Sequence, residues 1–187
     1  MTYFELFDIS PSFEVDLQQL KTKYRQLQQL HHPDKNQQDL NNQEQKSDVA
    51  SIHVANTAAL LQSSQINQAY QTLSFADSRA AYLLKLNKQD NGLENSIGDM
   101  DFLQHALELR EQLEEAQTTV ELDSLRNEVQ QWLDSLSREF VLDLEEKDWL
   151  DARDTTRKLR FIQRVLLDID KAEDRFDDLD SAFDDEF

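Results

Sequence analysis

Cysteine is absent from this chain of 187 residues. A chain without cysteine has no disulfide framework and no thiolate ligand for a metal centre. The absence excludes the cysteine spacing patterns that mark small secreted domains and zinc sites. Nothing in the composition therefore favours an oxidising compartment.

Glycine and proline are also scarce, with two of each in the whole chain. β-Hairpins and tight sheets depend on these residues at their turns. Long leucine-rich stretches with three- and four-residue spacing fill most of the sequence, and this spacing is typical of amphipathic helices. We predict an all-α fold, and the length is compatible with one or two domains.

Long apolar runs are missing as well. No stretch approaches the roughly 18 uninterrupted apolar residues of a transmembrane helix. The N-terminus lacks the basic region followed by an apolar core that marks a secretory signal. We expect a cytoplasmic protein that is neither secreted nor membrane-spanning.

Positive charge is scarce in the second half of the chain. The formal net charge is −19. Residues 1–88 carry 8 Lys/Arg and 9 Asp/Glu, whereas residues 89–187 carry 11 and 29. Phosphate contacts require clustered positive charge, so the second half argues against nucleic-acid binding. It favours a basic partner surface, or it serves only solubility.

No catalytic constellation is visible in the sequence. The four histidines (31, 32, 53 and 105) have no convergent Ser or Cys partner, and no glycine-rich loop for phosphate is present. A metal site from His31, His32 and Asp34 is disfavoured, because adjacent histidines on a helix point in different directions. We predict a protein that is not an enzyme and has no cofactor and no metal.

One stretch, DLQQLKTKYRQLQQLHHPDK at residues 16–35, combines several local signals. Its apolar residues recur every three or four positions, as on the buried side of a helix expected at 17–31. Asp16 is a suitable N-cap, and Pro33 ends the helix because it disfavours helical geometry at the preceding residue. The apolar stripe consists of Leu17, Leu20, Tyr24, Leu27 and Leu30. Lys21 and Arg25 lie one turn apart on the polar side.

This basic helix and the turn after it resemble helix II and the signature loop of a J domain, the module that stimulates ATP hydrolysis by DnaK-type chaperones. A His-Pro-Asp tripeptide alone is common by chance, but here it follows a capped basic helix. Segments 3–7 (YFELF) and 66–73 (INQAYQTL) resemble the first and third J-domain helices. The resemblance implies chaperone-binding roles for His32, Pro33, Asp34, Lys35, Lys21 and Arg25.

Three further segments resemble one branch of J proteins, the HscB co-chaperone family of iron–sulfur cluster assembly. They are 79–84 (RAAYLL), 102–111 (FLQHALELRE) and 157–161 (RKLRF), so the match covers nearly the whole chain. The resemblance implies a J domain followed by a C-terminal domain that binds the iron–sulfur scaffold protein. Because the chain has no cysteine, we expect it to act on the scaffold without holding a cluster through thiolates.

The expected organisation places a J domain at 1–88, a helical hairpin with two short flanking helices. Its parts include a loop at 36–48, a helix at about 57–73 and a short helix opened by Asp77. Both glycines lie in a linker at 89–99. A three-helix bundle at 100–175 follows, and the helix after 118 begins with a capping box while the helix after Asp148 is capped by that residue. Residues 176–187 form an acidic tail.

The helix expected at 101–115 has two apolar stripes on a wheel of about 100° per residue. Phe102, Ala106, Leu109 and Leu113 form the expected core stripe. Leu103 and Leu107 lie about a quarter-turn away, beside a row of glutamates. Periodicity alone favours one wide core stripe with an ordinary acidic outer face, whereas the resemblance favours a binding face. The implied scaffold-binding residues are Leu103, Gln104, Leu107, Glu108, Glu111, Glu115 and Phe161.

Two of these positions, Gln104 and Phe161, differ from the others. Gln104 departs from the apolar residue usual there, which predicts a weaker contact, and Phe161 is equally suited to the bundle core. The resemblance implies a co-chaperone that brings the scaffold protein to a DnaK/HscA-type chaperone, triggers ATP hydrolysis there and promotes cluster transfer. The alternatives are a J protein with another client and an acidic helical scaffold without chaperone activity; a metal-dependent hydrolase has no support.

Overall fold

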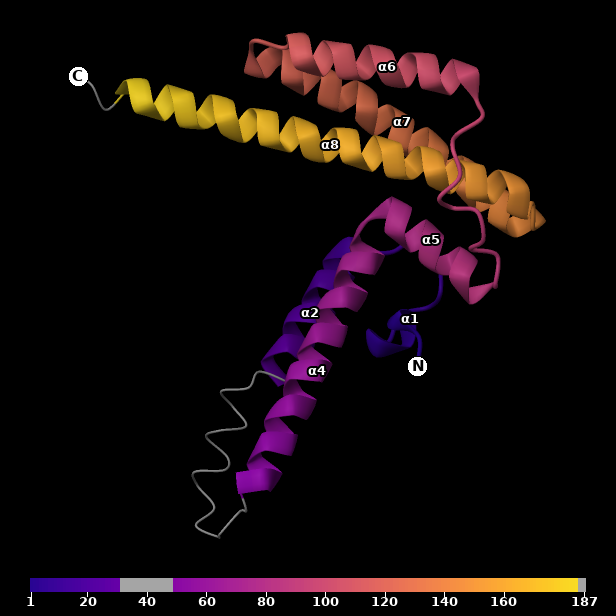
Figure 1. Ribbon diagram of the computed structural model, residues 1–187, viewed down its shortest axis with the longest axis vertical. Helices are drawn as coiled ribbons and strands as arrows, with labels where there is room; N and C mark the ends of the chain where they lie inside the picture. The colour runs from indigo at the N-terminus through magenta and orange to yellow at the C-terminus, as the bar shows by residue number, and fades with distance from the viewer. Residues whose placement is uncertain (31–48, 185–187) are drawn as a thin grey trace. The chain divides into compact units, whose positions relative to one another are not determined.

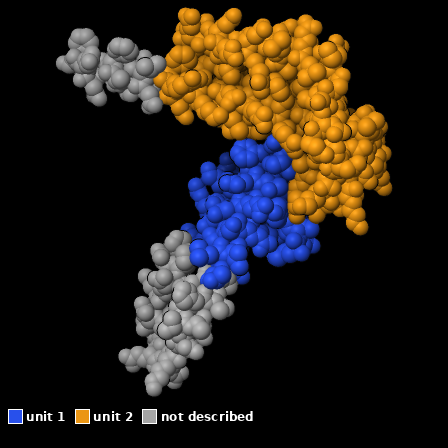
Figure 2. Space-filling model, viewed as in Figure 1, with its two compact units in different colours: residues 1–79 blue, residues 80–187 orange. Residues whose placement is uncertain are grey.

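The protein is almost entirely helical in the part that the computed structural model describes. The backbone is described for residues 1–30 and 49–184, and side chains for these residues except 49–56, 58, 59 and 177–184. No strand occurs within the described ranges. The chain divides into two compact units, Met1–Arg79 and Ala80–Phe187 (Figures 1 and 2). The predicted all-α class is confirmed.

The first unit begins with the short helix α1 (Tyr3–Leu6), which is fixed by a capping box. The Thr2 hydroxyl accepts from the Glu5 amide at 3.1 Å, and the Glu5 carboxylate accepts from the Thr2 amide at 2.6 Å. The hydrogen bond from the Thr2 amide keeps the pKa of the Glu5 carboxylate below its ordinary value. Phe4 and Phe7 are fully buried, as expected for a helix that covers a hairpin.

Helices α2 (Leu17–Leu30) and α4 (Val49–Ser74) form that hairpin. The Asp16 carboxylate caps α2 by accepting from the amides of Gln18 and Gln19 at 2.9 and 3.0 Å, as predicted. α4 starts earlier than the expected residue 57. The buried side chains of the hairpin and of the segments around it are Phe4, Phe7, Phe13, Leu20, Ile66, Ala69 and Leu73.

The apolar stripe predicted for α2 is only partly correct. Leu20 has no exposed surface, but Leu17 and Leu30 are 49% and 67% exposed. Both lie in the terminal turns of the helix, and Leu20 is the residue of α2 that is buried. Tyr24 and Leu27 are half-buried. Helical spacing therefore identified the correct side of α2 but overstated the length of its buried part.

Arg79 lies in α5 (Ala76–Leu86) and is the last residue of the first unit. Its side chain is buried, and it donates from Nε to the Phe13 carbonyl at 2.6 Å and from Nη1 to the Leu73 carbonyl at 2.5 Å. The guanidinium carbon lies 5.0 Å from the centre of the Phe13 ring. Burial lowers the pKa of Arg79 to about 10, so it remains charged at neutral pH. A charged side chain thus joins the segment before α2 to the end of α4.

The second unit contains three long helices, α6 (Met100–Glu115), α7 (Thr119–Glu146) and α8 (Trp149–Asp184) (Figure 1). The predicted capping box of α7 is present between Thr118 and Glu121. The Asp148 carboxylate accepts from the Asp151 amide at 3.2 Å, so the predicted cap of α8 is also present. α7 and α8 run antiparallel because only Lys147 and Asp148 join them, and Lys147 adopts a left-handed φ of 61°.

The core of the second unit lies mainly between α7 and α8, with α6 packed on both. It is a continuous apolar stripe, and each fully buried leucine or isoleucine stabilises the fold by roughly 1.5–3 kcal/mol. The buried side of α8 includes Thr156, whose hydroxyl donates to the Ala152 carbonyl at 2.7 Å. The buried apolar residues are Phe102, Ala106, Leu109, Leu122, Leu125, Val129, Leu136, Phe140, Ala152, Leu159, Ile162, Val165, Leu166, Ile169 and Ala172.

The segment predicted as a linker, 89–99, is fixed to α8. Arg157 donates to the Gly92 carbonyl at 3.0 Å, and Arg160 donates to the Leu93 carbonyl at 3.2 Å. Gly92 has a φ of +76°, in the left-handed region that favours glycine. The contact division falls before this segment, inside α5, so residues 89–99 belong to the second unit.

None of the described helices combines the length and the apolar character needed to cross a membrane.

Candidate functional site

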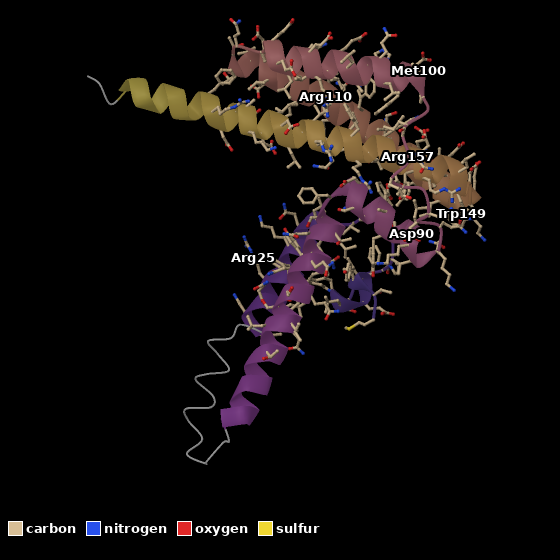
Figure 3. All side chains as sticks on the ribbon, viewed as in Figure 1. Arg25, Asp90, Met100, Arg110, Trp149 and Arg157 are labelled. Carbon is tan, nitrogen blue, oxygen red and sulfur yellow. The ribbon has the colours of Figure 1, made fainter. Side chains whose placement is uncertain are left out.

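The outer side of α2 carries the two predicted basic residues. Lys21 and Arg25 are both exposed, and neither forms an ion pair with another described residue (Arg25 is labelled in Figure 3). Lys23 differs, because it donates to the carbonyl and the carboxylate of Asp8 at 2.7 and 2.9 Å. The hydrogen bond from Lys23 lowers the pKa of Asp8. Lys21 and Arg25 therefore present positive charge to solvent, and Lys23 ties α2 to the end of α1.

A polar and aromatic cluster holds α2 on α4. The rings of Tyr24 and Tyr70 are stacked with centres 4.1 Å apart. The Tyr24 hydroxyl donates to Asn67 Oδ1 at 3.0 Å, and Gln28 donates to the same oxygen. Sequence spacing placed Tyr24 on the apolar side of its helix but did not identify this pairing across the hairpin. The cluster fixes the rotation of α2 and thus the direction in which Lys21 and Arg25 point.

The other four predicted chaperone-binding residues lie outside the described residues. They are His32, Pro33, Asp34 and Lys35. Their assignment stays a prediction from the sequence.

The exposed side of α6 carries the predicted leucine pair. Leu103 is 37% exposed and Leu107 is 58% exposed, whereas Phe102, Ala106 and Leu109 are buried. Leu113 is half-buried. The prediction that Leu103 and Leu107 lie off the core stripe is confirmed. A single wide core stripe is excluded for this helix.

Carboxylates border the leucine pair on one side. Glu108, Glu111 and Glu115 are all exposed. Gln104 is exposed too, and its amide donates to Glu108 Oε1 at 3.2 Å. This bond directs the Gln104 amide toward the glutamate row, so a polar group stands where an apolar contact was expected. The leucine pair therefore has a polar and acidic border along α6.

Phe161 of α8 lies on the opposite border and contributes to both the core and the surface. It is half-buried, and its ring meets the Phe102 ring edge-on with centres 5.8 Å apart. The guanidinium carbon of Arg110, which is labelled in Figure 3, lies 5.0 Å from the centre of the Phe161 ring, a cation–π arrangement. Arg110 was not among the predicted site residues. Its position about one turn after Leu107 and two turns after Leu103, on the same side of the helix, was the available signal.

Lys158 and Asp99 fix the N-terminal end of α6 on α8. Asp99 caps α6 by accepting from the Phe102 amide at 3.0 Å, and Lys158 donates to the same carboxylate at 2.8 Å. The bond from Lys158 lowers the pKa of Asp99. Burial alone would lower the pKa of Lys158, but its bonds to Asp99 and Asp154 raise it overall. Lys158 also lies 5.7 Å from the centre of the Phe102 ring.

No metal-binding group of three or more His, Asp or Glu side chains occurs among the described residues. The two surfaces are suited to binding partner molecules. α2 presents positive charge, and α6 presents apolar side chains between charged borders.

Two family models match the sequence. The DnaJ domain matches residues 2–82, and the HSCB C-terminal oligomerisation domain matches residues 98–170. A co-chaperone protein HscB homolog from Acinetobacter baylyi is 53% identical over 188 residues, covering 100% of both chains. A homolog from Acinetobacter baumannii is 52% identical over 184 residues, covering 98% of this chain and 97% of the relative.

This chain belongs to the HscB co-chaperone family. Solved structures agree with the assignment. Chaperone HscB from Vibrio cholerae superposes with a TM-score of 0.71 at 31% identity, covering 94% of this chain and 99% of that one. Human co-chaperone protein HscB superposes with a TM-score of 0.73 at 27% identity, covering 92% and 82%. The resemblance found in the sequence is confirmed, and both the J domain and the C-terminal HscB domain are present.

Proposed function

We propose that this HscB-family co-chaperone binds the iron–sulfur scaffold protein with its second unit and stimulates ATP hydrolysis by a DnaK/HscA-type chaperone with its first. The chaperone then closes on the scaffold, and cluster transfer to acceptor proteins is promoted. The chain itself acts by binding, and the hydrolytic chemistry belongs to the chaperone.

The observation that carries the proposal is the exposed leucine pair of α6. Apolar side chains of this size cost free energy when they remain in water, roughly 25 cal/mol for each Å² of apolar surface. On α6 they adjoin a buried stripe, a half-buried phenylalanine and a row of glutamates. An apolar centre with a charged border is the usual construction of a protein interface. It suits a scaffold protein whose contact surface is apolar and ringed by basic residues.

The charge on α2 supports the chaperone half of the proposal. Lys21 and Arg25 point to solvent on a helix that ends shortly before the His-Pro-Asp sequence at 32–34. Exposed charges of one sign guide association with a surface of opposite sign. The proline would fix the turn, and the Asp34 carboxylate would pair with an arginine of the chaperone.

One competing function keeps the chaperone half and changes the client. The exposed leucines favour a protein client of some kind but do not by themselves specify a scaffold. A helical protein without chaperone activity fits less well, because a J domain would then have no role. Titration with the scaffold and the rate of ATP hydrolysis separate these possibilities.

The test combines single-turnover ATP hydrolysis by the cognate chaperone with titration of the scaffold protein. Leu103→Ala with Leu107→Ala should weaken scaffold binding by about a hundredfold, because a few apolar anchors at an interface centre often dominate affinity. Stimulation of the chaperone in the absence of scaffold should be unchanged. The added stimulation that scaffold provides should be lost.

The matched control is Leu142→Ala with Leu150→Ala. These leucines are 57% and 68% exposed in the same unit and lie outside α6. The control removes the same atoms and should leave scaffold binding unchanged. Equal binding by both double variants would contradict the proposed scaffold face, and absence of any ATPase stimulation by the unmodified chain would contradict the chaperone half.

A further inference from the structure

A hollow of about 260 Å³ lies between the segment before α6 and the middle of α8. Its apolar lining comes from Leu93, Ile97 and Phe161, and its charged lining comes mainly from α8. Phe161 is also the residue over which Arg110 of α6 is stacked. The hollow is therefore continuous, through Phe161, with the border of the exposed leucine pair on α6.

The charge of this hollow is opposite to that of the unit around it. Residues 89–187 contain 29 Asp/Glu and 11 Lys/Arg, yet three arginines line the hollow. They are Arg157, Arg160 and Arg164 (Arg157 is labelled in Figure 3). Arg110 adds a fourth guanidinium on the other side of Phe161. A positive patch in so acidic a unit requires either internal acids to neutralise it or an external partner.

Internal acids neutralise this patch only in part. Arg160 and Arg164 are exposed, and neither forms an ion pair with a described residue. Arg160 has one hydrogen bond, to the Leu93 carbonyl at 3.2 Å. Glu94 lines the hollow without an ion pair to these arginines. Asp168 accepts a hydrogen bond from Lys171 at 2.8 Å, which is the main cause of its lowered pKa, and the charges of Arg110 and Arg164 contribute less. Most of the guanidinium donors at the rim remain open.

Arg157 supplies an independent observation. It is anchored by bonds from Nη1 to the Gly92 carbonyl at 3.0 Å and from Nη2 to Asp154 at 2.7 Å. Its Nε, by contrast, is buried and is the sole buried side-chain nitrogen or oxygen in the described part of the chain without a hydrogen-bond partner. A buried donor without an acceptor destabilises the fold by roughly 1–3 kcal/mol. The hollow thus contains donors in excess of acceptors.

We propose that the arginine-lined hollow binds an acidic segment of the same scaffold protein that docks on Leu103 and Leu107. Guanidinium groups bind carboxylates through paired hydrogen bonds, and the apolar wall of Leu93, Ile97 and Phe161 accommodates an apolar side chain next to the acid. The inference rests on the proposed function, since it assigns a second contact to the same face.

The consequence is a docking face with two charge signs. Glu108, Glu111 and Glu115 border the leucine pair on one side, and Arg110 borders it on the other. Phe161, over which Arg110 lies, also lines the hollow with Arg160 and Arg164. A partner with a basic patch and an acidic segment fits this face in one orientation, while the reversed orientation places like charges together. Such an arrangement fixes the register of the complex more than its affinity.

The test is a titration of purified scaffold protein with the full chain and two matched charge-reversal variants. Arg160→Glu with Arg164→Glu changes the rim of the hollow. Arg138→Glu with Arg175→Glu changes net charge equally at exposed positions outside it. The rim variant should bind scaffold about tenfold more weakly than the control variant, and its binding should depend less on salt. Arg160→Lys with Arg164→Lys should retain most of the affinity.

Two measurements keep the outcome decisive. If the rim variant is destabilised in a melting curve, Arg160→Gln with Arg164→Gln replaces it and should show a smaller loss in the same direction. Equal or tighter binding by the rim variants than by the control overturns the inference. If Leu103→Ala with Leu107→Ala loses binding while the rim variants do not, only the assignment of the hollow as a binding site is ruled out, and the proposed function stands. If the leucine variant binds normally, the proposed scaffold face itself fails.

Discussion

Helices α2 and α6 divide apolar and charged side chains in opposite ways. α2 buries Leu20 and exposes Lys21 and Arg25, whereas α6 exposes Leu103 and Leu107 and borders them with charge. Both helices belong to the same kind of amphipathic pattern, so periodicity alone does not separate them. The difference indicates that a partner of α2 is recognised mainly by charge, and a partner of α6 mainly by burial of apolar surface.

The two helices are also held differently. α2 is fixed on α4 by stacked tyrosines and an amide hydrogen-bond cluster, while α6 is fixed on α8 by an aromatic cluster and an ion pair at its first turn. Each anchor lies beside the exposed side chains and limits rotation of its helix. Rotation by one residue, about 100°, would turn the binding side inward. Substitutions that change either the residues that fix a helix or its exposed side chains, but not both, therefore test the comparison most directly.

The largest expected effect belongs to Asp34, which follows α2 in the sequence. Asp34→Asn should abolish stimulation of the chaperone ATPase while leaving thermal stability unchanged, because the side chain keeps its size and loses only its charge. Single-turnover hydrolysis and a melting curve on the same preparation measure both. The matched control is Asp39→Asn, which makes the same change in the next polar segment. Full stimulation by the Asp34 variant would show that the trigger lies elsewhere.

A second prediction compares the two sides of α6. Leu109→Ala removes a leucine that is 1% exposed, and it should lower the free energy of unfolding by about 2–5 kcal/mol. Leu107→Ala removes one that is 58% exposed, and it should lower it by less than about 1 kcal/mol. Denaturant unfolding at constant pH provides both values. Similar losses for the two variants would place Leu107 in the core and remove the basis of the binding face.

A third prediction concerns the charge on α2. Lys21→Glu with Arg25→Glu should weaken binding to the chaperone by about tenfold, and binding of the unmodified chain should decrease as salt rises. Gln18→Glu with Gln26→Glu changes exposed neighbours on the same helix by half as much charge and should have a smaller effect. Scaffold binding through α6 should respond less to salt. Chaperone binding that is indifferent to salt would mean that α2 docks through apolar contacts.

Sequence could predict features set by residues close together in the chain. The caps at Asp16, Thr118 and Asp148 were found because each needs only a suitable side chain before an apolar periodic stretch. The angle of Leu103 and Leu107 on the helix set them apart from the core stripe, and the family resemblance then favoured their exposure over one wide core stripe. These features depend on a few neighbouring positions and on the fixed geometry of a helix.

Other features depend on which helices meet, and periodicity does not supply that information. Arg79 is buried because carbonyls of Phe13 and Leu73 converge on it, from segments far apart in sequence. The stack of Tyr24 on Tyr70 and the position of Arg110 over Phe161 are likewise contacts between helices. For the same reason spacing could not show that the end turns of α2 would leave two leucines exposed.

The smallest expected effect tests the ion pair that fixes α6. Asp99→Asn keeps a side-chain oxygen for the cap of α6 and removes the charge that pairs with Lys158. The hydrogen bond from Lys158 depresses the pKa of Asp99 in the folded chain, so the carboxylate stabilises the fold above the ordinary pKa of aspartate. This stabilisation should be lost as the pH falls through the depressed value. The melting temperature of the variant should therefore lie slightly below that of the unmodified chain at pH 7, and the difference should shrink in acid below about pH 4.

Asp101→Asn, an exposed neighbour without this ion pair, should show a smaller difference at pH 7. A difference for Asp99→Asn that persists unchanged at the acid end would mean that the substitution acts through the cap and not through the charge.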